Sequence, residues 1–137
     1  VYVGVQAATE GWVSLSFIEQ LRDGGMDTIV GYVDEGGQSY ISDFHSSDRS
    51  MSGLQDDEES GGQFSLLEWS VKEVAAVEEE EEQPATTVME FRRRLDTGDN
   101  YDVQLLPGPN LFIWAFGYSD DITTSISERG YGVIELD

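Results

Sequence analysis

The sequence contains no cysteine, so disulfides, zinc–thiolate sites, iron–sulfur clusters and cysteine nucleophiles are all excluded. It contains a single histidine, His45, so histidine-based catalysis would have to use that residue. Long hydrophobic runs are also absent, because no stretch approaches the ~20 apolar residues of a membrane-spanning helix. We therefore expect no membrane insertion. No signal peptide is visible, and the opening residues already look like a strand, so we expect a processed chain or a fragment.

Basic residues are scarce: 7 Lys and Arg stand against 28 Asp and Glu, giving a net charge of −21 over 137 residues. A phosphate backbone or an anionic membrane surface would be repelled, so neither is an expected partner. Acidity of this kind suits a protein kept soluble in high salt, where charge repulsion is screened. A generally acidic extracellular surface explains it equally well.

Short β-like runs separated by turn residues dominate the chain. They alternate apolar and polar residues, and no segment keeps a helical period. The runs are residues 1–7, 11–17, 27–34, 39–44, 64–73, 86–95, 110–119 and 130–137. This spacing predicts an all-β fold, an antiparallel, immunoglobulin-like β-sandwich of about eight or more strands in a single domain over residues 1–137.

Turn chemistry supports this organisation. Gly36 and Gly37 can adopt the positive φ angles of a tight hairpin between two of the runs. Residues 45–63 and 74–85 are expected to be acidic loops, the second carrying five consecutive glutamates. One short helical turn is expected at residues 18–22.

Candidate catalytic groups are few. A serine triad would need His45 as its base, and no Gly-x-Ser-x-Gly motif is present, so we do not expect an enzyme. Asp96, Asp99 and Asp102 lie in a turn and could bind calcium with Asn100. Asp and Asn are also ordinary turn residues, so the identity of any metal stays open.

Two stretches carry a resemblance to a known family. "GWVSLSF" followed by "GGMDTIVGYVDEGGQSYISDFHS" resembles the first half of a DOMON domain, and "TTVMEFRRRLDTGDNYDVQLLPGPNLFIWAFGYSDDI" resembles the second half. The family is allied to the cytochrome domain of cellobiose dehydrogenase. The resemblance implies an extracellular or cell-surface β-sandwich that binds haem b or, by inference, a sugar.

Two departures from the family pattern qualify that expectation. Haem-binding members hold iron with a methionine and a histidine; Met26 matches the methionine, but Ser125 stands at the histidine position. A serine hydroxyl is a poor axial ligand, so the expectation is no cofactor, with haem b as an alternative through Met26 and His45. Members also carry one or two strands before the one matching "VYVGVQA", and their absence would leave an open sheet edge.

The resemblance and the aromatic residues together define a candidate ligand pocket. Its members are expected to be Trp12, Met26, Tyr32, Trp114, Tyr118 and Ser125. Each aromatic residue could equally be a core residue. Among the three consecutive arginines, alternation predicts that Arg93 points opposite to its neighbours and forms a structural salt bridge with Asp120 or Asp121, and Arg129 is a candidate for the same role.

Three functions follow from these observations. The first is a non-catalytic extracellular module that binds a small sugar-like or haem-like ligand. The second is a subunit of a filament or surface layer that self-associates by strand addition through "VYVGV" or "GVIEL". The third is a haem-b electron-transfer domain.

Overall fold

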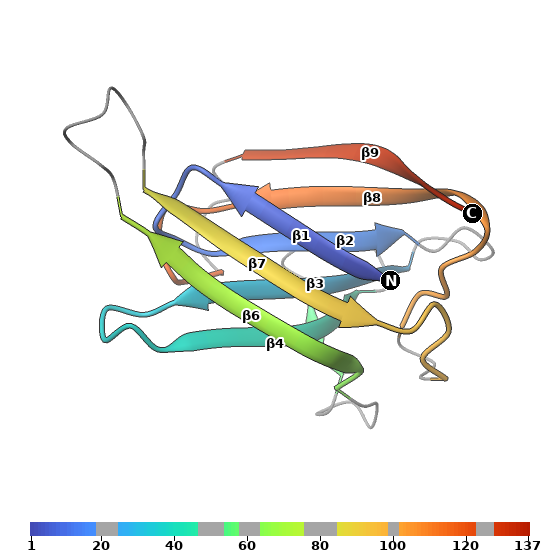
Figure 1. The fold of residues 1–137 in the computed structure, drawn as a ribbon, viewed down its shortest axis with the longest axis horizontal. Helices are drawn as coiled ribbons and strands as arrows, with labels where there is room; N and C mark the ends of the chain where they lie inside the picture. Colours follow the sequence, from blue (N-terminus) through green and yellow to red (C-terminus); the bar gives the residue numbers. More distant parts are fainter. Residues whose placement is uncertain (19–24, 47–53, 58–63, 76–84, 99–101, 123–127) are drawn as a thin grey trace.

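The computed structural model describes residues 1–18, 25–46, 54–57, 64–75, 85–98, 102–122 and 128–137 (Figure 1). They form nine strands: β1 (Tyr2–Ala7), β2 (Val13–Ile18), β3 (Met26–Val33), β4 (Ser39–Ser46), β5 (Gln55–Asp56), β6 (Leu66–Val74), β7 (Thr86–Arg93), β8 (Gly108–Phe116) and β9 (Glu128–Leu136). The all-β prediction is confirmed. Among these residues, no helix has the length and apolarity to cross a membrane.

The strand predictions differ from the structure in two places. All eight predicted runs contain a strand, but the short β5 lies within residues 45–63, which were expected to form a loop. The helical turn expected at residues 18–22 begins at the last residue of β2, and the rest of it lies outside the described residues.

The strands form two antiparallel sheets of unequal width. One has three strands in the order β1-β7-β6, and the other has six in the order β5-β4-β3-β2-β8-β9. Figure 1 shows the narrow sheet crossing the wide one at an angle, with both chain ends at the same end of the molecule. The hairpin between β3 and β4 uses Gly37 at φ 82°, as the sequence predicted, whereas Gly36, for which a positive φ was also expected, does not adopt one.

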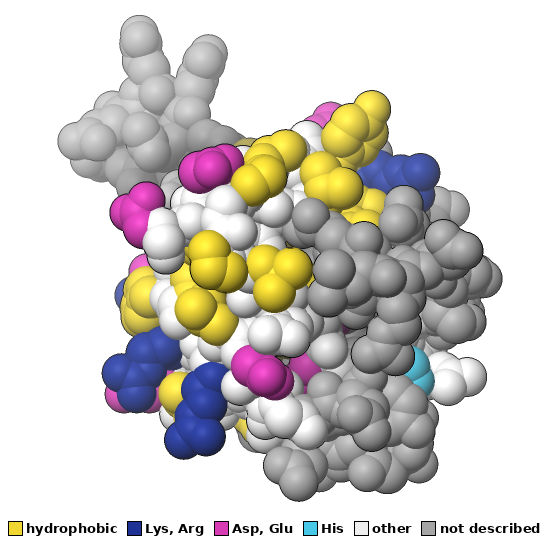
Figure 2. Space-filling model, turned by 90° about the vertical axis from the view of Figure 1, so that its right-hand side faces the viewer, with side chains coloured by type: hydrophobic (Ala, Val, Ile, Leu, Met, Phe, Trp, Pro, Cys, Tyr) yellow, Lys and Arg dark blue, Asp and Glu magenta, His cyan; other side chains and the backbone are white. Residues whose placement is uncertain are grey.

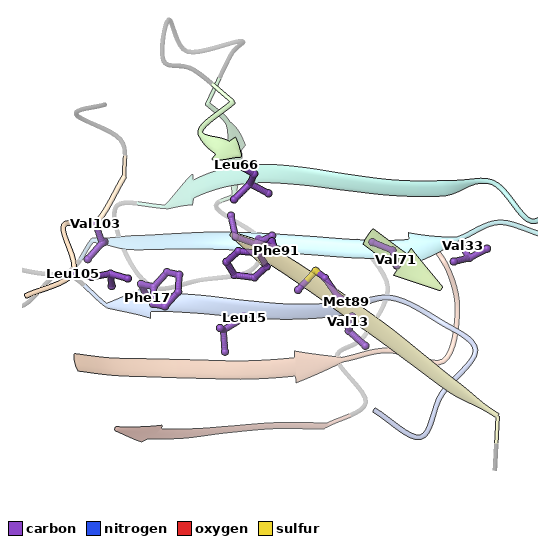
Figure 3. Close-up of a cluster of buried hydrophobic side chains, with 11 residues drawn as sticks. Val13, Leu15, Phe17, Val33, Leu66, Val71, Met89, Phe91, Val103 and Leu105 are labelled. Carbon is purple, nitrogen blue, oxygen red and sulfur yellow. The ribbon is translucent and has the colours of Figure 1, made fainter. Parts of the chain in front are cut away.

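The core lies between the two sheets and follows the alternation of the strands. Val13, Leu15 and Phe17 of β2 point inward and pack against the narrow sheet. Met89 and Phe91 of β7 meet them from the other side (Figure 3), and the rings of Phe17 and Phe91 pack edge to face at 6.5 Å. The inward residues of β2 and β3 are therefore those at odd positions, and the even positions lie on the opposite face of the wide sheet.

Candidate functional site

Met26 and His45, the two candidate iron ligands, lie on opposite faces of the wide sheet. Cross-strand partners share a face, and here Met26 pairs with Ser46 while Asp27 pairs with His45. Met26 is buried on the outer face. The Nδ1 atom of His45 lies 2.8 Å from Oδ1 of Asp57, so the histidine is already bound elsewhere. Because His45 is the sole histidine of the sequence, Met26 has no histidine partner on its own face.

The predicted ligand pocket is divided in the same way. Trp12, Met26 and Tyr32 occupy even positions on the outer face, and Trp12 is fully buried in a small cluster with Val30. Trp114 lies on the inner face of β8. The other two members do not join them: Tyr118 is 68% exposed, and Ser125 lies outside the described residues. The prediction of one pocket shared by these residues is therefore wrong for those that are described.

An apolar groove runs between β1 and β8, beyond the edge of the narrow sheet. The narrow sheet ends at β1, whereas the wide sheet continues from β8 to β9, so the inner face of these last strands is only partly covered. The groove has a volume of about 540 Å³. Its floor is aromatic, with the rings of Trp114 and Phe116 stacked at 6.2 Å beside Phe112, and Gln6 and Glu128 also line it.

The position of the Trp114 ring depends on a glycine in the neighbouring strand. A Cβ atom on Gly130 would lie 2.4 Å from Cζ2 of Trp114, which no packed structure tolerates. Gly130 is the register partner of Trp114, so its missing side chain is what lets the indole lie flat over β9. The packing of Trp114 therefore explains why the residue after Arg129 is a glycine.

A second, smaller cavity of about 200 Å³ lies at the end of β1 where the two termini meet. Its lining includes Val1, Val3, Leu105 and Ile134, so it is apolar like the groove. Figure 2 views the molecule from this end and shows hydrophobic side chains on the described surface. The open side of β1 is therefore apolar along most of its length.

Along its outer edge, β1 pairs with no other strand among the described residues. Val1 and Arg93 exchange backbone hydrogen bonds of 2.7 Å and 3.0 Å, so alternate residues from Val1 onward bond to β7. The N–H and C=O groups of Tyr2, Gly4 and Gln6 consequently point toward the open edge.

Arg93 is the one of the three consecutive arginines that enters the interior, at the opposite side of the core. It points opposite to its two neighbours, as the alternation predicts. Its Nη1 atom donates to Oδ2 of Asp27 at 2.7 Å, and both side chains are almost fully buried. Nη2 donates to the carbonyl of Val103 at 2.6 Å, and the guanidinium lies 5.2 Å from the ring centroid of Phe17. The predicted partners Asp120 and Asp121 are wrong, since the ion pair is made with Asp27.

Asp120 lies at the other end of the sheet from Asp27. Burial, and then the charges of Asp34 and Glu35, raise the pKa of the Asp120 carboxyl. Arg129 is exposed at the start of β9, where it is paired in register with Ala115. Neither Asp120 nor Arg129 belongs to the buried ion pair.

Four aspartates meet around Arg93 at this closed end of the core. Asp27, Asp43 and Asp57 are buried, and Asp102 is half-buried beside them. One oxygen of each carboxylate makes a polar contact: Asp27 with Arg93, Asp43 with the backbone N–H of Ser65, Asp57 with His45, and Asp102 with the hydroxyl of Thr97. The other oxygen of each is buried and has no hydrogen-bond partner among the described residues.

Burial and the neighbouring carboxylates disfavour the ionised form of the aspartates in this cluster. Burial raises the pKa of Asp27 to about 6 against the lowering effect of Arg93. Burial and the charge of Asp27 raise the pKa of Asp43 to about 9, and burial with the adjoining Asp102 carboxyl raises that of Asp57 to about 10. One guanidinium does not balance four carboxylates, so protons or a cation must supply the rest.

Two residues of this cluster could have been identified from the sequence, although the sequence analysis did not single them out. Asp27 and Asp43 sit at inward positions of otherwise apolar alternations, with Ile29 and Ile41 as their neighbours on the same face. A charge at such a position is rarely buried without a partner. Asp102 was a candidate calcium ligand in the sequence, but in a turn site with Asp96, Asp99 and Asn100, of which residues 99 and 100 lie outside the described residues. The structure groups it instead with Asp27 and Asp43. Asp57 carries no signal of either kind, because it lies outside the long strands.

The fold and these sites place the chain in a known class of β-sandwich. A family model described as the DOMON domain matches residues 1–117, and the chain belongs to that family. Among solved structures, it is similar to the cytochrome b domain of pyranose dehydrogenase from Coprinopsis cinerea, with a TM-score of 0.54 and 17% sequence identity. The match covers 97% of this chain and 66% of that one, less than two thirds of its length; at this identity it shows the fold alone.

Proposed function

We propose that this chain is a non-catalytic, extracellular DOMON module that binds a neutral, sugar-like ligand in the groove between β1 and β8. The observation that carries the proposal is the aromatic floor made by Trp114 and Phe116 beneath an open groove of about 540 Å³. This volume lies within the range of small-molecule sites, about 300–1,000 Å³.

A sugar ring suits this groove chemically. Its C–H face packs on an indole or phenyl ring, and its hydroxyls need polar partners at the edge. Gln6 and Glu128 are side chains of that kind in the lining. The net charge of −21 repels anionic ligands, which favours a neutral sugar.

The haem alternative finds less support in the residues. The similar solved structure is named a cytochrome b domain, so a fold of this kind can hold haem. In this chain, however, the outer face around Met26 offers Ser14, Ser16 and Thr28, and the hydroxyls of Ser16 and Thr28 bond to each other at 2.7 Å. The residues described here do not fit a haem held by methionine and histidine, because His45 faces the other way.

Sugar binding is tested by titrating the purified chain with a panel of neutral mono- and oligosaccharides, using tryptophan fluorescence and calorimetry. The test variant is Trp114→Leu, which keeps apolar bulk but removes the stacking ring. The control is Leu111→Ala, because Leu111 is 45% exposed on the outward face of the same strand. We expect Trp114→Leu to weaken binding at least about tenfold, roughly the loss of one aromatic contact, and the control to bind normally. Equal affinity in both variants would reject the groove as the site.

An absorption spectrum of the same preparation, oxidised and then reduced with dithionite, tests the haem alternative. We expect no Soret band. A Soret band that sharpens on reduction would establish haem and make electron transfer the leading function, and Met26 would then be the first ligand to replace.

A second candidate function, self-association by strand addition, is favoured by the β1 edge. Edge strands are commonly protected by charge. The edge strand β6 carries Glu68, Lys72 and Glu73, and β9 carries Glu128, Arg129 and Glu135, whereas β1 has no charged side chain. Antiparallel pairing of two β1 strands would join two narrow sheets and cover both grooves.

The test of this candidate is the oligomeric state measured by sedimentation across protein and salt concentrations, since salt screens the charge on each subunit. Gln6→Pro removes an N–H that faces the open edge and leaves the bonds to β7 intact. We expect it to abolish association, while Gln6→Ala associates like the parent chain. A parent chain that stays monomeric in high salt would contradict the candidate.

A further inference from the structure

Three buried carboxylates converge at one point in the core, at the end of the sandwich where β3 begins and β7 ends. Asp27, Asp43 and Asp102 each offer an oxygen, and these oxygens all lie within 4.8 Å of one another. The three residues come from β3, from β4 and from the segment before β8, so the site is built by the tertiary fold and not by one loop.

The unpartnered oxygens are what distinguish this cluster from an ordinary acidic surface. Asp27 is fully buried and Asp43 is 4% exposed, and yet one oxygen of each has no hydrogen-bond partner among the described residues. Leaving such an acceptor unsatisfied in the interior is destabilising, and more so if it is charged. The unpartnered oxygen of Asp102 and that of the adjoining Asp57 repeat the pattern.

The remaining oxygens are held in place by the protein. Oδ2 of Asp27 accepts from Nη1 of Arg93 at 2.7 Å and from the backbone N–H of Val103 at 3.1 Å. Oδ2 of Asp43 accepts from the backbone N–H of Ser65 at 3.3 Å, and the carbonyl of Asp43 accepts from the N–H of Asp57 at 3.1 Å. Each carboxylate is thus oriented through one oxygen and leaves the other available, which is how supporting contacts position metal ligands.

We propose that Asp27, Asp43 and Asp102 form a binding site for one divalent calcium ion, with Asp57 as a fourth carboxylate beside it. Calcium takes oxygen ligands at about 2.3–2.6 Å, so oxygens that lie within 4.8 Å of one another can reach one ion. Magnesium usually keeps several waters and binds through only one or two carboxylates, so a site of three carboxylates favours calcium. With no cysteine in the sequence and His45 occupied by Asp57, the donors are hard oxygens, which favour calcium over zinc or copper.

The charge of the site agrees with this assignment. Four carboxylates face the single permanent charge of Arg93, and a doubly charged ion would remove most of the excess.

The test uses the full chain stripped with a chelator and then titrated with calcium chloride alone at constant ionic strength. Calorimetry gives the stoichiometry, and thermal unfolding gives the stabilisation. We expect one saturable site per chain, a higher Tm in calcium, and weaker effects with magnesium. Asp43→Asn should reduce the affinity by more than about tenfold, because carboxylate charge sets calcium affinity.

The matched control is Glu68→Gln, which removes one exposed carboxylate from β6 and should bind calcium like the parent chain. Asparagine has nearly the same size and shape as a protonated aspartate, so without calcium Asp43→Asn should be about as stable as the parent chain; if it fails to fold, Asp102→Asn replaces it. A parent Tm that does not respond to calcium would overturn the proposal. Protons alone would then neutralise the carboxylates of the cluster. The proposal would also be overturned if the parent chain bound several calcium ions and Asp43→Asn bound them equally well. That result would mean that calcium is attracted to the acidic surface in general.

Discussion

The aspartate cluster and the groove are two parts of the described structure that the apolar core does not fill, and they differ in how they are closed. At the cluster, β6 and β7 of the narrow sheet lie over β3 and β4, and the space is occupied by charged groups pinned by hydrogen bonds. At the groove, none of the described strands lies beyond β1, and the space is bounded by aromatic rings and left open.

This difference shows how the unequal widths of the two sheets divide the possible functions. A closed, charged space suits a small ion, because carboxylates there are desolvated and hold a cation strongly. An open, apolar space suits a larger ligand that can enter from solvent. Each of the following changes should affect one region and leave the other intact.

Breaking the buried ion pair should give the largest effect. Arg93→Met keeps most of the side-chain volume but leaves Asp27 and its neighbours without a cation, so we expect a loss of about 3–5 kcal/mol in the free energy of unfolding. Arg92→Met is the control, since Arg92 is exposed and lies 3.6 Å from an exposed Glu68, a pair worth less than about 1 kcal/mol. Urea unfolding of both variants measures the difference in the free energy of unfolding. Similar losses in the two variants would show that the buried ion pair of Arg93 stabilises the fold no more than the exposed pair of Arg92.

The pH dependence of the calcium-free chain should follow from the same cluster. Asp27, Asp43 and Asp57 have pKa values raised to about 6, 9 and 10, so the folded state holds protons that the unfolded state has lost. Their contribution is fully present below about pH 4, the ordinary aspartate pKa, and is lost as the pH rises through these values. Stability in chelator should therefore fall from about pH 4 toward pH 10.

Two variants sharpen this prediction. Asp43→Asn removes one of the raised carboxyls and should flatten the decline, whereas Glu68→Gln should leave it unchanged. Thermal unfolding measured across the pH range in chelator supplies the profile. A parent chain whose stability increases between pH 5 and pH 9 would contradict the electrostatic account of the cluster.

A change at the groove should have an intermediate effect. Gly130→Ala puts a methyl group 2.4 Å from Cζ2 of Trp114, so the ring must move and we expect a loss of about 1–3 kcal/mol. Gly4→Ala is the control, because its Cβ would meet only the flexible side chain of Glu90 at 3.8 Å. Tryptophan emission and chemical unfolding report the result. Calcium binding should be unaffected, and a loss of both properties would mean that the two regions are coupled.

The sequence predicted the strands well because each alternation is local and short. It also predicted that Arg93 points opposite to Arg92 and Arg94, since that depends only on the position of the residue in its strand. It left open which of the three arginines enters the interior. It could not identify Asp27 as the partner, because that contact joins residues 66 positions apart and needs the register of both sheets. The predicted pocket failed for the same reason: Trp12 and Trp114 each alternate plainly, but only the sheet pairing shows that they lie on different faces.

The smallest expected effect separates Tyr118 from Trp114, two residues that the sequence placed in one pocket. Tyr118 packs edge to face on Phe116 at 5.9 Å but is 68% exposed and is not part of the groove lining. Tyr118→Ser should therefore cost no more than about 1 kcal/mol, the value of one exposed aromatic pair. Sugar affinity should stay unchanged where Trp114→Leu lowers it. If Tyr118→Ser weakened binding as much as Trp114→Leu, the site would extend past the end of β8 and would include more residues than those that line the groove.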